Sequence, residues 1–130
     1  MKGLVAIPLL ALAGCAALDQ GPTTLAGEWG GPHIGLILEG GLGTVEYDCA
    51  SGTIDQAIPF ADGPFTVAGT HRTGQGGPVR VGQIFTSQRA TYTGEHVKGD
   101  ITLSVKLEDG EALGPFTLKQ GAPPQISRCL

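Results

Sequence analysis

Hydrophobic and polar residues alternate along much of the chain after residue 32, with the period of two that is typical of β-strands. The alternation is clearest over residues 33–39, 43–50, 65–71 and 101–107. In the last stretch, one face carries four aliphatic side chains: Ile101, Leu103, Val105 and Leu107. No stretch shows a sustained helical period, so the pattern predicts an all-β protein.

Short turn sequences separate the predicted strands. They are Gly40-Gly41, Ser51-Gly52, Asp62-Gly63-Pro64 and Glu108-Asp109-Gly110. Further strands are expected at 53–58, 89–95 and 111–119, and the longest irregular region at 72–88, while residues 124–130 end the chain. Because the connections are short, we expect a single small antiparallel meander of 7–8 strands, forming a closed or partly open barrel. A two-layer β-sandwich is the alternative.

The composition fits this pattern. The chain has 130 residues, of which 22 are glycine and 9 are proline. Such a content can indicate disorder, but here these residues punctuate the apolar alternation, as turns and tight bends do. A chain of this length can hold one hydrophobic core.

The first residues, MKGLVAIPLLALAGC, follow a different pattern. Lys2 precedes an apolar segment, residues 4–12, that is too short to span a bilayer. This arrangement is typical of a secretory signal. The tetrapeptide Leu12-Ala13-Gly14-Cys15 resembles the lipobox of bacterial lipoproteins, and the resemblance implies that Cys15 is lipidated and becomes the first residue. A secreted protein without lipid is the alternative.

The resulting organisation is a lipoprotein signal peptide at 1–14, a lipidated cysteine and short tether at 15–24, and a β domain at 25–130. The expected location is the bacterial cell envelope, with the periplasmic face of the outer membrane favoured because Ala16, and not aspartate, follows Cys15. The full chain has a formal net charge of −4 and no basic cluster. This charge argues against binding to nucleic acid or to anionic phospholipid headgroups.

The three cysteines differ in expected role. With Cys15 acylated, Cys49 and Cys129 remain. Because the periplasm is oxidising, we expect a Cys49–Cys129 disulfide. A zinc site is the alternative, although the two cysteines lack C-x-x-C spacing.

Two short motifs resemble known families. Gly27-Glu28-Trp29 is similar to the G-x-W motif of lipocalins and other calycins, which implies that Trp29 closes one barrel end beneath a basic residue, here Arg128. An ordinary core tryptophan is the alternative. Tyr47-Asp48-Cys49 with Gly52, Ala90-Thr91-Tyr92 and the late Cys129 resemble segments of membrane-bound inhibitors of C-type lysozyme. That resemblance implies an exposed Tyr92 on a protruding loop.

Catalytic chemistry is not evident in the sequence. His33, His71 and His96 show none of the spacings of zinc motifs, so we expect exposed turn histidines, no metal and no cofactor. No nucleophile is paired with a base at a recognisable spacing. The acidic pairs Glu46/Asp48 and Asp109/Glu111 are expected on solvent-facing edges.

The candidate binding residues surround the glycine-rich stretch at 74–82. They are His71, Arg72, Arg80 and Tyr92, which suit a small anion or an acidic partner. The favoured function is therefore a non-enzymatic envelope lipoprotein whose β domain binds an unknown protein or small ligand. Inhibition of lysozyme is the first alternative, and a metal-dependent hydrolase using His33 and His71 is the second.

Overall fold

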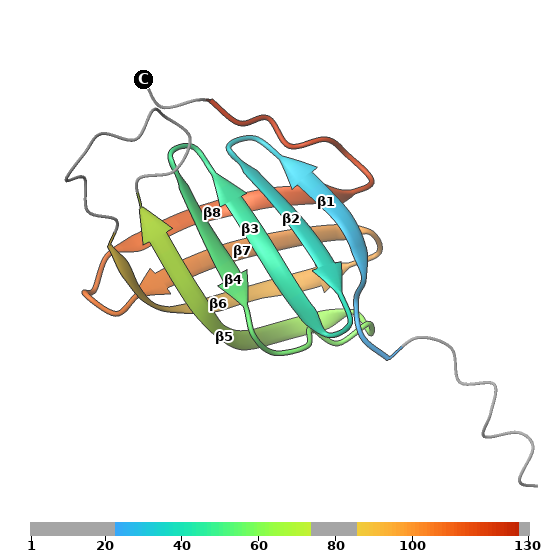
Figure 1. Cartoon of the computed structure of the whole chain (residues 1–130). Helices are drawn as coiled ribbons and strands as arrows, with labels where there is room; N and C mark the ends of the chain where they lie inside the picture. The colour runs from blue at the N-terminus through green and yellow to red at the C-terminus, as the bar shows by residue number, and fades with distance from the viewer. Residues whose placement is uncertain (1–22, 74–85, 128–130) are drawn as a thin grey trace, which may run out of the picture.

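The computed structural model, which describes residues 23–73 and 86–127, is a closed antiparallel barrel of eight strands in sequential order (Figure 1). The strands are β1 (Gly27–Gly31), β2 (Ile34–Glu39), β3 (Leu42–Tyr47), β4 (Ala50–Ile54), β5 (Gly63–Thr73), β6 (Ser87–Val97), β7 (Asp100–Leu107) and β8 (Ala112–Gln120). The predicted meander is confirmed. Because β1 also pairs with β8, the sheet closes into a barrel and not a sandwich.

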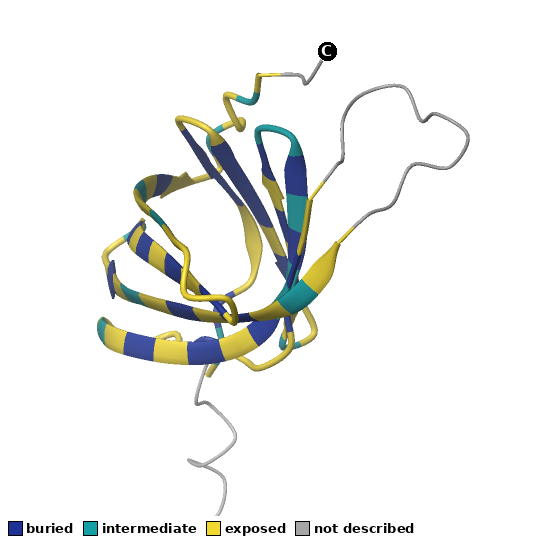
Figure 2. Cartoon of the chain, turned by 90° about the vertical axis from the view of Figure 1, so that its left-hand side faces the viewer, coloured by how far each residue is buried: buried dark blue, intermediate teal, exposed yellow. Residues whose placement is uncertain are grey.

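The interior of the barrel is built by the alternation seen in the sequence. Along β7, Ile101, Leu103, Val105 and Leu107 are all buried. In β2, Leu36 is 1% exposed while Ile37, which points outward, is 52% exposed. Figure 2 shows the same alternation as bands of buried and exposed residues along the strands. The inner face therefore carries the hydrophobic core, and the outer face is mostly polar.

The barrel has two ends that we call the base and the mouth. The base contains residues 23–26, where the described chain begins, together with the 55–62 loop and the Lys98-Gly99 turn. The mouth, at the other end, contains turns 32–33, 48–49 and 108–111. A short antiparallel bridge, Thr24 with Pro59, holds the first described residues against the base.

One predicted turn is wrong. The β3–β4 hairpin turns at Asp48-Cys49, where Cys49 has a φ of 64°, whereas Ser51-Gly52 lies inside β4. Cys49 is accordingly in a turn at the mouth and not within a strand. A Cβ on Gly52 would lie 2.5 Å from the Thr70 carbonyl oxygen and 2.6 Å from the Tyr92 hydroxyl, so this glycine makes room for both instead of forming a turn.

The C-terminal segment, residues 122–127, forms no ninth strand as far as the structure describes it. It crosses the outside of β1 and β2 toward the mouth (Figure 1). His33 donates its N–H to the Gln125 carbonyl at 2.8 Å, and Gln125 donates to Gly31 at 3.0 Å. A Cβ on Gly35 would lie 2.7 Å from Pro124, so this glycine allows the segment to approach. Among the described residues, no helix has the length and apolar character needed to cross a bilayer.

Candidate functional site

The mouth leads into a cavity of about 240 Å³ inside the barrel. Its inner walls are largely aromatic and come from Tyr47, His71 and Phe116. The Tyr47 ring lies 5.1 Å from the His71 ring and 5.8 Å from the Phe116 ring, centroid to centroid. The rim is polar and includes His33, Asp48 and Glu111. This arrangement, with apolar walls and a few polar groups, is common in binding sites for small molecules.

Strand alternation places each wall residue. His71 follows Phe65, Val67 and Gly69 on the inner face of β5, and Tyr47 is the last inward residue of β3. On β8, Phe116 and Leu113 face this cavity but are only partly buried. The pairing of β7 with β8 shifts register between Leu103 and Val105, so the wall is irregular on this side.

Two polar atoms in the cavity walls are buried without a hydrogen-bond partner among the described residues. They are the Tyr47 hydroxyl and His71 Nδ1. An unpartnered buried polar group costs about 1–3 kcal/mol, and most such groups in proteins are paired with protein or with water. The site therefore contains unused hydrogen-bonding capacity beside two aromatic rings.

Burial keeps both of these side chains neutral. It raises the pKa of Tyr47 far above its usual value, and the neighbouring Tyr92 hydroxyl adds to the shift. It lowers the pKa of His71, although the carboxylates of Glu111 and Asp109 oppose the shift. At neutral pH the walls thus present a phenol and an uncharged imidazole, and each can donate or accept a hydrogen bond.

The rim is organised around Asp48. Its Oδ1 accepts a hydrogen bond from the Ser127 backbone N–H at 2.7 Å, and its Oδ2 lies 2.6 Å from His33 Nδ1. The Ser127 hydrogen bond first and His33 second hold the pKa of Asp48 below its usual range. The carboxylate therefore joins the C-terminal segment to two turns of the mouth.

The predicted binding residues do not all meet at this site. His71 points into the barrel, whereas Arg72, the next residue on β5, is exposed and does not line the cavity. Tyr92 is completely buried in β6 and donates a hydrogen bond from its hydroxyl to the Thr70 carbonyl at 2.8 Å. It does not line the cavity, and it does not meet the requirement of the lysozyme-inhibitor hypothesis for an exposed tyrosine on a loop.

Several predicted features lie outside the described residues. They are the signal peptide, Cys15, Arg80, Arg128 and Cys129. The Cys49–Cys129 pairing accordingly stays a prediction.

The histidines differ from expectation. His33 is exposed, but His71 and His96 are only 3% and 6% exposed, so the prediction of exposed turn histidines is wrong for these two. Both occupy inward positions of strands. His33 and His71 line the same cavity, yet within residues 23–73 and 86–127 no group of three potential metal ligands is assembled.

His96 lies at the base, where it packs against Trp29. The two rings meet edge to face with centroids 5.7 Å apart, and Trp29 is 1% exposed. The tryptophan is a core residue near the base, and Arg128, which the lipocalin resemblance would place over it, lies outside the described residues. The described aromatic partner of Trp29 is a histidine, and the indole N–H donates to the Ala26 carbonyl at 3.2 Å.

The sequence analysis did not single out Phe116 or Leu113, and it placed Glu111 only on a solvent-facing edge. The alternation of β8 could have placed Phe116 on the inner face, but the openness of the mouth depends on the packing of several strands. What the site offers is hydrogen bonding beside aromatic surface, with a histidine–carboxylate pair at the rim. No family model, no curated protein and no solved structure matches the chain.

Proposed function

We propose that this chain is an envelope lipoprotein whose barrel binds a small uncharged ligand at the mouth. The observation that carries the proposal is the pair of unpartnered polar atoms, the Tyr47 hydroxyl and His71 Nδ1, in the walls of an open cavity. A ligand with an oxygen or nitrogen between them would complete their hydrogen bonds.

The size and chemistry of the cavity define the ligand class. About 240 Å³ corresponds to the liquid volume of roughly eight water molecules, less than a drug-sized ligand requires. Aromatic walls favour a planar apolar body. The carboxylates of Asp48 and Glu111 at the rim, together with a neutral His71, disfavour an anion. A small aromatic amide or phenol fits these conditions.

Access to the polar atoms requires a local movement. In the barrel both atoms are covered, while Leu113 and Phe116 are partly buried side chains of the cavity wall. Side-chain rotation at these two positions of β8 would open a path to Tyr47 without changing the barrel. Rotamer changes of this kind are common at binding sites.

The lipid anchor is the second part of the proposal. The lipobox-like Leu12-Ala13-Gly14-Cys15 supports it, and three acyl chains exceed what stable membrane attachment needs. Residues 23–25 join the barrel at its base, opposite the mouth. An anchor at Cys15 would therefore leave the mouth facing away from the membrane. Metabolic palmitate labelling of the full chain, compared with Cys15→Ser, tests this part.

Ligand binding can be tested with two defined probes, benzamide and phenol. We expect millimolar probe to shift the NMR signals of Tyr47, His71 and Phe116 in the wild-type domain. Tyr47→Phe, which keeps the ring and removes the hydroxyl, should weaken probe binding by roughly tenfold, the effect of one hydrogen bond. The comparison variant is Tyr92→Phe, because Tyr92 is also buried but does not line the cavity, and its hydroxyl donates to the Thr70 carbonyl. Equal effects of the two variants would contradict the assignment.

A further inference from the structure

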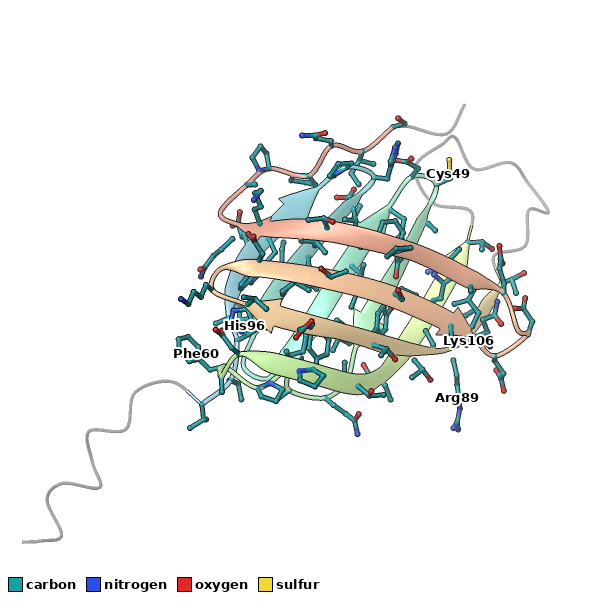
Figure 3. The ribbon with its side chains drawn as sticks, turned by 180° about the vertical axis from the view of Figure 1, so that it is seen from behind. Cys49, Phe60, Arg89, His96 and Lys106 are labelled. Carbon is teal, nitrogen blue, oxygen red and sulfur yellow. The ribbon has the colours of Figure 1, made fainter. Side chains whose placement is uncertain are left out.

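The base of the barrel presents two exposed apolar side chains beside the point where the described chain begins. Phe60 and Val97 are each 47% exposed. The Phe60 N–H donates to the Thr23 carbonyl at 3.0 Å, so Phe60 lies directly against the first described residue. Figure 3 shows Phe60 next to His96 at the base, at the opposite end of the barrel from Cys49.

The backbone around Phe60 is held in place. Besides the hydrogen bond to Thr23, Leu25 donates to the Ile58 carbonyl at 2.8 Å. The Phe60 ring lies 6.3 Å from the ring of His96, which in turn contacts Trp29. The backbone at Phe60 is thus held by hydrogen bonds, while its side chain is half exposed. A shallow hollow of about 430 Å³ lies beside it, and Leu25 and Ala61 contribute to its lining.

The charged side chains at this end include both signs, with no excess of basic ones. Asp62 and Asp100 accompany Lys98 and Lys119, and the Lys119 ammonium lies 3.4 Å from the Asp100 carboxylate. The base therefore has no excess of positive charge that would select anionic lipids. Any affinity of this end for a membrane must come from its apolar side chains.

The length of the preceding chain decides what these side chains meet. Cys15 and Thr23 are separated by roughly eight residues, which span at most about 29 Å when fully extended. An anchor at Cys15 would hold the base within that distance of the bilayer. The tether would keep the bilayer at a high effective concentration around the base. A contact between the base and the bilayer could then form even if it were too weak to recruit an untethered protein.

We propose that the base is a lipid-contact surface, with Phe60 and Val97 inserted at the boundary between headgroups and acyl chains. Aromatic side chains are enriched at this depth. The inference rests on the proposed anchor at Cys15. It adds an orientation, since contact at the base would direct the mouth into the aqueous space.

Tryptophan scanning tests the contact. Chains starting at residue 16 contain every described residue, and an N-terminal hexahistidine tag would attach them to phosphatidylcholine vesicles containing nickel-chelating and brominated lipids. Phe60→Trp is compared with Ile37→Trp, because Ile37 is similarly exposed, at 52%, on the side of the barrel. Buried Trp29 gives both variants the same background. We expect brominated lipid to quench Phe60→Trp at least twofold more than Ile37→Trp, with no dependence on added phosphatidylglycerol.

Equal quenching of the two variants would overturn the proposal. The proposal would also be overturned if, without vesicles, Phe60→Trp dimerised and its fluorescence emission shifted to the blue. The base would then be covered by a second copy of the chain. Because the hexahistidine tag attaches the chain to the vesicles, the quenching result does not depend on whether Cys15 is lipidated. Failure of palmitate labelling at Cys15 would therefore overturn the anchor separately.

Discussion

His71 and His96 occupy equivalent inward positions on neighbouring strands, but the two ends of the barrel surround them differently. Each has a buried Nδ1 without a hydrogen-bond partner among the described residues. His96 packs against Trp29 and Phe60, and its Nδ1 lies 3.7 Å from the Asp62 carboxylate. His71 contacts Tyr47 and borders an open cavity. His96 also borders the shallow hollow of about 430 Å³ at the base. The two histidines thus differ in their partners, a buried tryptophan at the base and a tyrosine beside a cavity at the mouth.

The difference follows from the side chains opposite each histidine. At the base, the bulk of Trp29 fills the barrel. At the mouth, the lining includes the smaller Ala50 and Thr73, and space remains. The two ends thus differ in what surrounds the histidine, with Trp29 at the base and small residues between aromatic ones at the mouth.

The largest expected effect separates the two ends by stability. Trp29→Ala should lower the free energy of unfolding by about 3–5 kcal/mol, because it leaves a large cavity in a closed core. His71→Ala, at the edge of an existing cavity, should lower it by about 1 kcal/mol or less. Urea unfolding of both variants measures the difference. Equal losses would show that the mouth is packed as tightly as the base.

A second test concerns how the mouth is held. If Cys49 and Cys129 are bridged, the disulfide closes a loop of about 80 residues, and its removal should cost about 4 kcal/mol. The contact of Ser127 with Asp48 supports the pairing, because it brings the C-terminal segment beside Cys49. Thiol labelling of the denatured, non-reduced domain should detect neither cysteine. Labelling of both would reopen the zinc alternative.

The two inner tyrosines should respond in opposite ways to loss of the hydroxyl. Tyr92→Phe removes a hydrogen bond to the Thr70 carbonyl and should cost about 1 kcal/mol of stability. Tyr47→Phe removes an unpartnered hydroxyl, so stability should stay the same or rise by a few tenths of a kcal/mol. Thermal unfolding of both variants gives the comparison. A clear loss of stability in Tyr47→Phe would reveal a partner for its hydroxyl.

The smallest expected effect is a dependence of stability on pH. Burial lowers the pKa of His71 in the folded state, so the unfolded chain binds the proton more tightly. The contribution of His71 to the free energy of unfolding is fully present above about pH 6.5, the ordinary pKa of histidine. It is lost as the pH falls from there through the lower pKa of the folded state. In His71→Gln, the urea concentration at the midpoint of unfolding should change less between pH 7.5 and pH 5.5 than it does in the wild type. An unchanged slope would show that another group titrates.

The sequence predicted the fold better than the site. The alternation of hydrophobic and polar residues identified the inward residues of β2 and β7, because a strand with one buried face has every second side chain in the core. It could not show that Gly52 belongs in a strand, since the reasons are the close approach of the Thr70 carbonyl and of Tyr92, which lies some forty residues away. By the same alternation, the inward position of His71 was readable from Phe65 and Val67. The unpartnered atoms depend on how separate strands pack, which periodicity does not describe.

The pairing of β1 with β8 has a consequence for the order of folding. Most strands pair with their neighbours in sequence and can form hairpins as soon as both strands exist. Closure joins Trp29 to Gln120, and the C-terminal segment then bonds to Gly31 and His33. These contacts are the most distant in sequence, so the entropy of closing the chain opposes them most strongly. Until β8 has paired with β1, the folding barrel has two unpaired edge strands, and such edges are open to pairing with other chains.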